Sequence, residues 1–155
     1  MSRQGAPVVS DGVTREQFIE LVRAQPRGVV ATVGPDGAPQ AALVDFAVTD
    51  DGHLVFDSAS DARKIDNIRA DARVAVVVGC EGQACVQVEG VADIATGAAR
   101  VEFGRVYEAR FPGARALADG FSVIRVRPHR LRLYDAALDP PSVVEGVPGW
   151  LRALT

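Results

Sequence analysis

The chain has 155 residues, 48% of them hydrophobic and 24% charged, with a formal net charge of −3 at pH 7, which is typical of one soluble globular domain. The acidic balance argues against nucleic acid as the main partner, because proteins that bind a phosphate backbone usually carry a strong basic excess. The sequence contains no apolar run near the length of a membrane span and no secretion signal, so we expect a cytoplasmic protein that does not bind membranes.

The first predicted element is a helix over residues 14–24. It opens on "TREQ", a capping box in which the Thr and Gln side chains each accept a hydrogen bond from the backbone N–H of the other residue. Phe18, Leu21 and Val22 follow at helical spacing. The sequence "QPRG" then ends the helix.

Three short apolar runs follow, at residues 28–34, 39–48 and 54–58. The turn sequence "PDGA" separates the first two, and "TDDGH", which contains an Asp-Gly hairpin signal, separates the second from the third. Connections this short favour an antiparallel meander, because β-α-β units need much longer ones.

The second half of the chain adds a short helix, two strands, a longer helix and a last strand. The helix "DARKIDNIRA" is expected to bury Ile65 and Ile68, and the strands read "RVAVVVG" and "ACVQVEGVADI". A helix over residues 96–111 precedes the last strand, "FSVIRVRPHRLRLYD", in which Pro128 requires an edge position or a bulge.

The pattern as a whole predicts a mainly β fold with six antiparallel strands in a closed or nearly closed barrel and a few flanking helices. We expect residues 1–135 to form the barrel domain. Residues 136–155 are rich in proline and glycine, and we expect an irregular C-terminal tail of the same domain, with Trp150 and Leu151 as docking points.

Several common catalytic and metal sites are missing from the sequence. It contains no G-x-G-x-x-G or Walker phosphate loop and no G-x-S-x-G elbow. His53 and His129 lack zinc-ligand spacing and stand in no recognisable triad. We interpret Cys80 and Cys85 as reduced thiols in or beside strands, although a disulfide across a hairpin remains open.

The best candidate site is the stretch "FDSASDARKIDNIRADARVAVVVG". The hydroxyls of Ser58 and Ser60, the free N–H groups at a helix start, and the cations Arg63 and Lys64 would together suit a phosphate. Asp61 favours the alternative, a capped and solvated helix start, because an N-cap carboxylate would use the same amides and repel an anion.

Arginine recurs on the last strand in a regular pattern. Arg125 and Arg127 alternate with apolar residues, as do Arg130 and Arg132 beyond a change of parity at Pro128. The pattern fits the solvated face of a half-buried strand. It also fits a basic rim over a pocket or subunit contact, where Arg125 and Arg127 would line the mouth of a substrate site.

Three segments, "VVATVGPDGAPQAALVDF", "HLVFDSASDARKIDNIRADARVAVVVG" and "VQVEGVADI", together resemble the pyridoxamine 5′-phosphate oxidase-like superfamily of flavin-binding split β-barrel proteins. The similarity covers roughly residues 28–94 and returns in the last strand. It implies a six-stranded split barrel and a homodimer with FMN at the subunit interface. Some relatives use the deazaflavin F420 instead, and some bind haem.

The resemblance also assigns site residues. The two cations that grip the FMN phosphate fall on Arg63 and Lys64, and the aromatic that packs near the flavin from the partner subunit falls on Tyr134. With Ser60 from the local argument, the expected cofactor-binding set is Val44, Asp45, Asp57, Ser58, Ser60, Arg63, Lys64 and Tyr134.

Two departures from the family pattern bear on the substrate. Gln40 and Asp45 stand where the oxidase proper carries basic residues, and its C-terminal Arg-x-His pair has no counterpart in "ALDPPSVVEG". We therefore expect a flavin-dependent oxidoreductase acting on a small molecule other than pyridoxamine phosphate. An F420-dependent reductase and a non-catalytic flavin- or haem-binding module are the alternatives.

Overall fold

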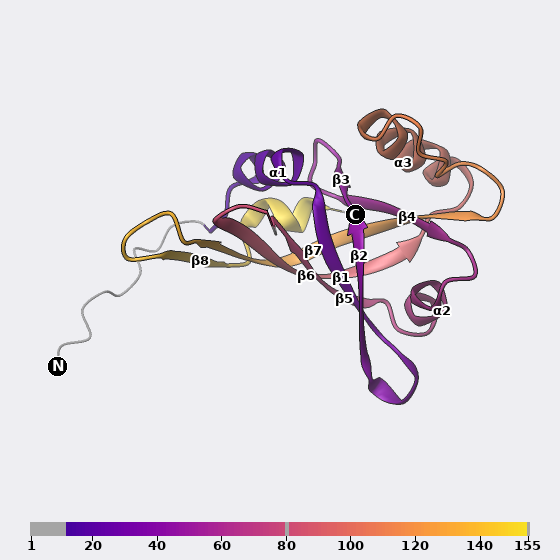
Figure 1. The fold of residues 1–155 in the computed structure, drawn as a ribbon, viewed down its shortest axis with the longest axis horizontal. Helices are drawn as coiled ribbons and strands as arrows, with labels where there is room; N and C mark the ends of the chain where they lie inside the picture. The colour runs from indigo at the N-terminus through magenta and orange to yellow at the C-terminus, as the bar shows by residue number, and fades with distance from the viewer. Residues whose placement is uncertain (1–11, 80, 155) are drawn as a thin grey trace.

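The computed structural model describes residues 12–79 and 81–154. In chain order its elements are α1 (Arg15–Ala24), β1 (Arg27–Val33), η1 (Pro35–Gly37), β2 (Pro39–Asp45), β3 (Ala47–Val48), β4 (Leu54–Ala59), α2 (Arg63–Ala70), β5 (Arg73–Val78), β6 (Ala84–Ile94), α3 (Gly97–Arg110), β7 (Phe121–Asp135), β8 (Ser142–Gly146) and η2 (Gly149–Ala153) (Figure 1). The capping box at Thr14 and the burial of Ile65 and Ile68 confirm the predictions for α1 and α2.

The strands form one antiparallel sheet in the order β2-β1-β5-β6-β7-β4-β3, with β8 added to β7. Strands β2 and β3 are adjacent in the chain but lie at opposite ends of this order. The sheet must therefore curl until its two ends approach one another, and Figure 1 shows the resulting half-barrel with its flanking helices. This architecture confirms the prediction of a mainly β split barrel.

The run at residues 39–48 differs from its prediction as a single strand in a meander. It breaks at Phe46, which is fully buried, packs edge-on against Phe56, and donates its backbone N–H to the Pro26 carbonyl at 2.8 Å. The chain therefore leaves the β1–β2 hairpin, and β4 pairs with β3 and β7 instead of β2.

The proline in β7 lies at a bulge, as expected. Gly90 pairs with Pro128 while Glu89 pairs with Arg130, so the exposed His129 is the extra residue. A Cβ at Gly90 would lie 2.6 Å from the Arg127 carbonyl oxygen. Only glycine fits opposite the bulge.

The tail from Ala136 was expected to be irregular, but it contains β8 and η2. Strand β4 covers only the first half of β7, up to Val126, so the second half offers a free edge that β8 fills. Beyond it Leu151 is buried, and Trp150 packs against Phe18 and donates its indole N–H to the Val13 carbonyl at 2.9 Å. The two docking residues are thus confirmed.

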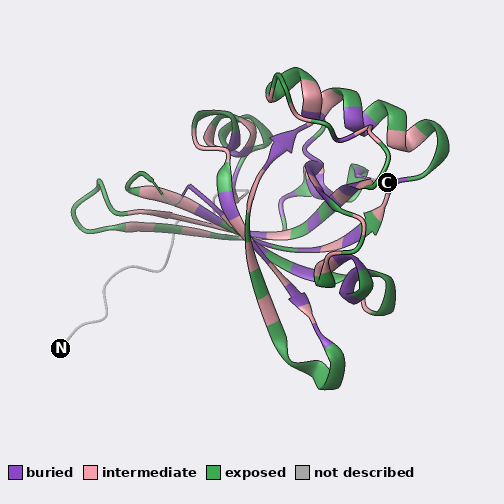
Figure 2. Cartoon of the chain, turned by 45° about the vertical axis from the view of Figure 1, so that its right-hand side comes forward, coloured by how far each residue is buried: buried purple, intermediate pink, exposed green. Residues whose placement is uncertain are grey.

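The core lies on the concave side of the sheet. Buried and exposed residues alternate along the strands (Figure 2), as expected when one face is packed. Within residues 12–79 and 81–154, no helix is long and apolar enough to cross a membrane.

Candidate functional site

The candidate cofactor site lies between β2 and the start of α2. Strand β2 ends the sheet, so one of its edges has no strand partner. A pocket of about 210 Å³ lies here, and its lining includes Thr32 of β1, Gln40 of β2, and Arg63 and Lys64 of α2. The fold thus brings the two predicted cations to the inward face of the end strand.

Both cations in this pocket are available to an anion. Arg63 is exposed, Lys64 is half-buried, and neither forms an ion pair with any acidic residue in the described part of the chain. Cations without a carboxylate partner keep their full charge for a ligand, and Arg adds a planar fork suited to phosphate oxygens.

The first turn of α2 also lacks a side-chain cap. Its N-cap is Ala62, which has no side-chain acceptor. Asp61 is exposed and precedes the N-cap position by one residue. The alternative that Asp61 caps the helix is therefore wrong. The start of α2, where the helix dipole is positive, lines this pocket through Ala62, Arg63 and Lys64.

A buried polar network forms one side of the pocket. The side-chain Nδ2 of Asn67 donates to the Thr32 hydroxyl at 2.9 Å and to Oε1 of Gln40 at 3.0 Å. Thr32 and Asn67 are both buried. Sequence reasoning missed this network, because Asn67 is an ordinary polar residue within a helix pattern and its partners lie in other elements.

The two predicted serines lie elsewhere. Ser58 is buried and donates to the Ala59 carbonyl at 3.1 Å, and the hydroxyls of Ser60 and Ser122 are 2.8 Å apart. Neither serine lines the pocket that contains Arg63 and Lys64. Their hydroxyls support the junction of β4 and β7.

Two of the predicted aspartates gather near a tyrosine at the other end of β2, roughly 17 Å along the strand from Gln40. Asp45 pairs with Arg27 at 3.2 Å, and Asp57 accepts a hydrogen bond from Tyr107 of α3. Burial, with the negative charges of Asp57 and Asp45, raises the pKa of Tyr107, so its hydroxyl stays protonated. Sequence reasoning missed Tyr107, since an aromatic residue in a helix is most often part of the core.

The remaining predicted site residues are separated from the cations within one chain. Val44 packs against the core opposite Gly28. Tyr134 lies roughly 40 Å along β7 from Ser122, the partner of Ser58, between Cys85 and Val143 of the neighbouring strands.

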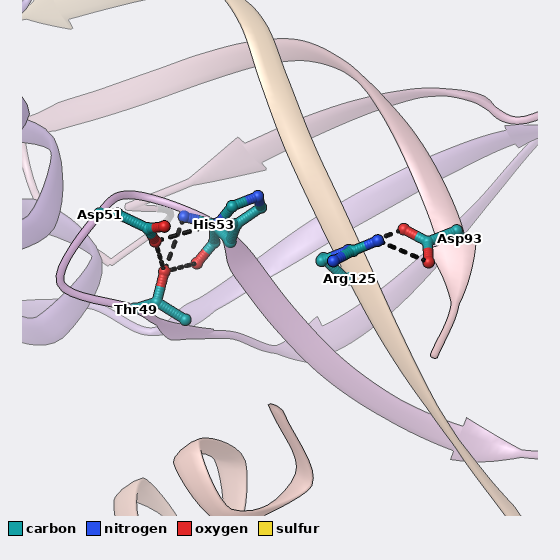
Figure 3. Close-up of polar contacts among 5 residues, drawn as sticks. All are labelled: Thr49, Asp51, His53, Asp93 and Arg125. Carbon is teal, nitrogen blue, oxygen red and sulfur yellow. Dashed lines mark hydrogen bonds and ion pairs between the residues drawn. The ribbon is translucent and has the colours of Figure 1, made fainter. Parts of the chain in front are cut away.

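The arginines of β7 mostly form ion pairs. Arg125 binds Asp93 through two hydrogen bonds of 2.9 and 3.1 Å (Figure 3). Arg130 and Arg132 approach Glu145 of β8. These pairs favour the interpretation of a solvated strand face over a basic rim for the three arginines.

A second polar cluster lies next to Arg125. His53 is buried, its Nδ1 is 3.0 Å from Asp51, and Thr49 bonds to both residues (Figure 3). The ring of Phe103 packs between His53 and Arg125, 5.7 Å and 5.2 Å away. This cluster ties the β3–β4 turn to α3 and β7, away from the pocket at α2.

The remaining sequence candidates are the two cysteines and the potential metal ligands. Cys85 is a free thiol, and Cys80 lies outside the described residues. Among the described His, Cys, Asp and Glu residues, no group of three could hold a metal ion.

The comparisons with known proteins identify a family and a fold. A family model described as pyridoxamine 5′-phosphate oxidase matches residues 14–135. A solved structure named F420 reductase is 28% identical over 72% of this chain and 93% of its own, with a TM-score of 0.57. The comparison with curated proteins gave no match.

Two further solved structures share the fold at lower identity. A haem-binding protein from Mycobacterium smegmatis is 20% identical, with a TM-score of 0.74 over 94% of this chain and 62% of its own. A pyridoxamine 5′-phosphate oxidase-related, FMN-binding protein from Nostoc punctiforme is 16% identical, with a TM-score of 0.58 over 83% of each chain.

Proposed function

The chain belongs to the pyridoxamine 5′-phosphate oxidase family, and from this membership we propose that it is a homodimeric, FMN-dependent oxidoreductase. Its substrate is a small molecule other than pyridoxamine phosphate, because Gln40 and Asp45 replace the basic residues that the resemblance leads one to expect.

The observation that carries the proposal is the pocket at the start of α2. Arg63 and Lys64 lie there without acidic partners in the described chain, beside an uncapped helix start and the hydroxyl of Thr32. A phosphate monoester carries about 1.5 to 2 negative charges at pH 7 and only acceptor oxygens on its outer face. Two cations and several donors match that charge and that chemistry, so the residues fit the phosphate end of FMN.

Asp45 and Asp57 do not cancel this match, because neither lines the pocket. Asp45 is neutralised by Arg27 at 3.2 Å, and Asp57 accepts from Tyr107. Both lie toward the far end of β2, where the resemblance puts the ring system of the flavin. When bound, a flavin itself supplies the hydride or electron transfer, while the protein binds and orients it and tunes the charge around its ring.

An apolar sheet face supports the homodimer. The outward side chains of β2, β1 and β5 lie in register across the sheet. Leu43, at the β2 end of one row, is 66% exposed, although large apolar side chains are usually buried or scattered on the surface of a monomer. The two rows are Leu43, Val29, Val77 and Ala41, Ala31, Ala75.

A second copy packed on this face would also explain the position of Tyr134. Within one chain it is far from Arg63 and Lys64, so it could join the cofactor site only from the partner subunit. We therefore place the cofactor between the two subunits.

Flavin titration tests the proposal. The purified protein is expected to bind FMN at micromolar concentration or tighter, with the flavin absorbance bleaching when a reduced nicotinamide is added. Arg63→Ala with Lys64→Ala should lower FMN affinity by at least tenfold while leaving riboflavin affinity unchanged, because riboflavin lacks the phosphate. Arg69→Ala is the matched control, since Arg69 lies on the same helix and already pairs with Asp66.

One observation favours a second candidate cofactor. The solved structure named F420 reductase is 28% identical to this chain, and F420 carries a phosphodiester with a single negative charge. Tighter binding of F420 than of FMN would replace the flavin with the deazaflavin in the proposal. Protein that takes up neither cofactor would refute it.

A further inference from the structure

The side-chain amide of Asn67 donates both of its hydrogens to acceptors within the protein. Its Nδ2 atom donates to Oγ1 of Thr32 at 2.9 Å and to Oε1 of Gln40 at 3.0 Å. A primary amide nitrogen has two N–H donors and no acceptor. Asn67 is only 5% exposed. It thus joins α2 to β1 and β2 through one nitrogen, both of whose N–H donors are in use.

These two hydrogen bonds decide which atoms Thr32 and Gln40 can offer to a ligand. The Thr32 hydroxyl already accepts a hydrogen bond, so its own hydrogen is left to donate. The Gln40 oxygen is likewise occupied, which leaves its Nε2 group as the free end of the amide. In the described part of the chain, neither the Thr32 hydroxyl nor Nε2 of Gln40 donates a hydrogen bond to a protein acceptor.

We propose that Asn67 is a positioning residue that leaves Thr32 and Gln40 with hydrogen-bond donors to offer and so favours a phosphate group in the pocket. This inference rests on the proposed function and names the group that the site recognises. With Asn67 in place, Thr32, Gln40, Arg63 and Lys64 all present hydrogens, which suits phosphate oxygens and opposes a group with hydrogens of its own.

The arrangement also gives Gln40 a role in place of a basic residue. A glutamine amide can turn either its oxygen or its nitrogen toward a ligand, and only the nitrogen helps to bind an anion. Asn67 holds the oxygen and thereby leaves the nitrogen as the free end of the amide. Gly34 leaves space beside it, because a Cβ at Gly34 would lie 2.7 Å from Nε2 of Gln40.

The test compares FMN with riboflavin in two variants of Asn67. Asn67→Asp keeps the shape of the side chain but can only accept hydrogen bonds, and Asn67→Ala removes the group without adding charge. We expect either variant to weaken FMN binding by about 10- to 100-fold and to change riboflavin affinity by less than about threefold. This phosphate-dependent split is something a merely structural role would not produce.

Inorganic phosphate provides a second measurement that does not depend on the flavin. Millimolar phosphate should raise the thermal midpoint of the wild-type protein through linkage and should raise that of the Asn67 variants much less. Thr32→Val serves as an independent variant if a variant of Asn67 fails to fold, because it removes the hydroxyl donor at nearly constant volume. It should produce the same selective loss of FMN affinity.

The outcomes separate this inference from the proposed function. Equal losses of FMN and riboflavin affinity in the Asn67 variants would overturn the inference and leave the flavoprotein proposal standing. Full FMN affinity in Asn67→Asp would overturn it as well, since Asn67 would then present its oxygen to the network. Wild-type protein that binds phosphate but no flavin would refute the proposed function alone, and protein that binds neither would refute both.

Discussion

Leu43 offers a quantitative test of the proposed dimer. Its side chain is 66% exposed on the apolar sheet face of β2, β1 and β5, at the edge formed by β2. Full burial of a Leu side chain is worth about 1.5–3 kcal/mol, so covering the exposed two thirds would contribute roughly 1–2 kcal/mol per subunit. A twofold interface uses the residue twice, and Leu43→Ala should cost the dimer about 2–4 kcal/mol.

The expected change is large enough to measure directly. A loss of about 2–4 kcal/mol weakens the dimer roughly 30- to 700-fold, which analytical ultracentrifugation over a range of concentrations resolves. The unfolding free energy of the isolated monomer should change by less than about 0.5 kcal/mol, because Leu43 makes few contacts within its own chain. FMN affinity should fall along with the dimer.

A matched control is available on another surface. Leu138 is 54% exposed in the turn between β7 and β8, outside this face, so Leu138→Ala should leave the dimer unchanged. The assignment of this face would be refuted if the dimer dissociation constant of Leu43→Ala lay within threefold of the wild-type value. It would also be refuted if the wild-type protein stayed monomeric over a 100-fold range of concentration.

Three further predictions concern stability. Trp150→Phe removes the hydrogen bond to the Val13 carbonyl and should lower the unfolding free energy by about 1 kcal/mol in urea titrations. Because burial raises the pKa of Tyr107 above its ordinary 10.0, the folded state keeps a proton that the unfolded chain loses. Stability should therefore fall as the pH rises through about 10, and Tyr107→Phe should flatten that decline in denaturation curves between about pH 9 and 11. Gly90→Ala places a Cβ 2.6 Å from the Arg127 carbonyl oxygen and should lower the thermal midpoint by several degrees, consistent with about 1–3 kcal/mol of strain; an unchanged midpoint would contradict the bulge geometry.

Local sequence signals predicted most elements because their causes are local. The capping box at Thr14, the turn residues between strands and the bulge at Pro128 each depend on neighbours within a few positions. Adjacent cations at Arg63 and Lys64 were visible for the same reason.

The features that escaped prediction depend on distant partners. Phe46 breaks a strand without a proline or glycine, since its buried ring and its bond to Pro26 decide the turn. Tyr107 acquires its raised pKa from burial and from aspartates in other elements. The Asn67 network joins three elements, and no sequence pattern within α2 predicts it.

The strand order also has a consequence for how the protein is made. Ser58 of β4 pairs with Ser122 of β7, so the ribosome must add the whole of β5, β6 and α3 before β4 meets its main partner. At roughly 5–20 residues per second, Leu54, Val55 and Phe56, all fully buried in the finished fold, stay without that partner for roughly 3–13 seconds. This apolar triplet therefore needs protection from aggregation while the rest of the chain is made.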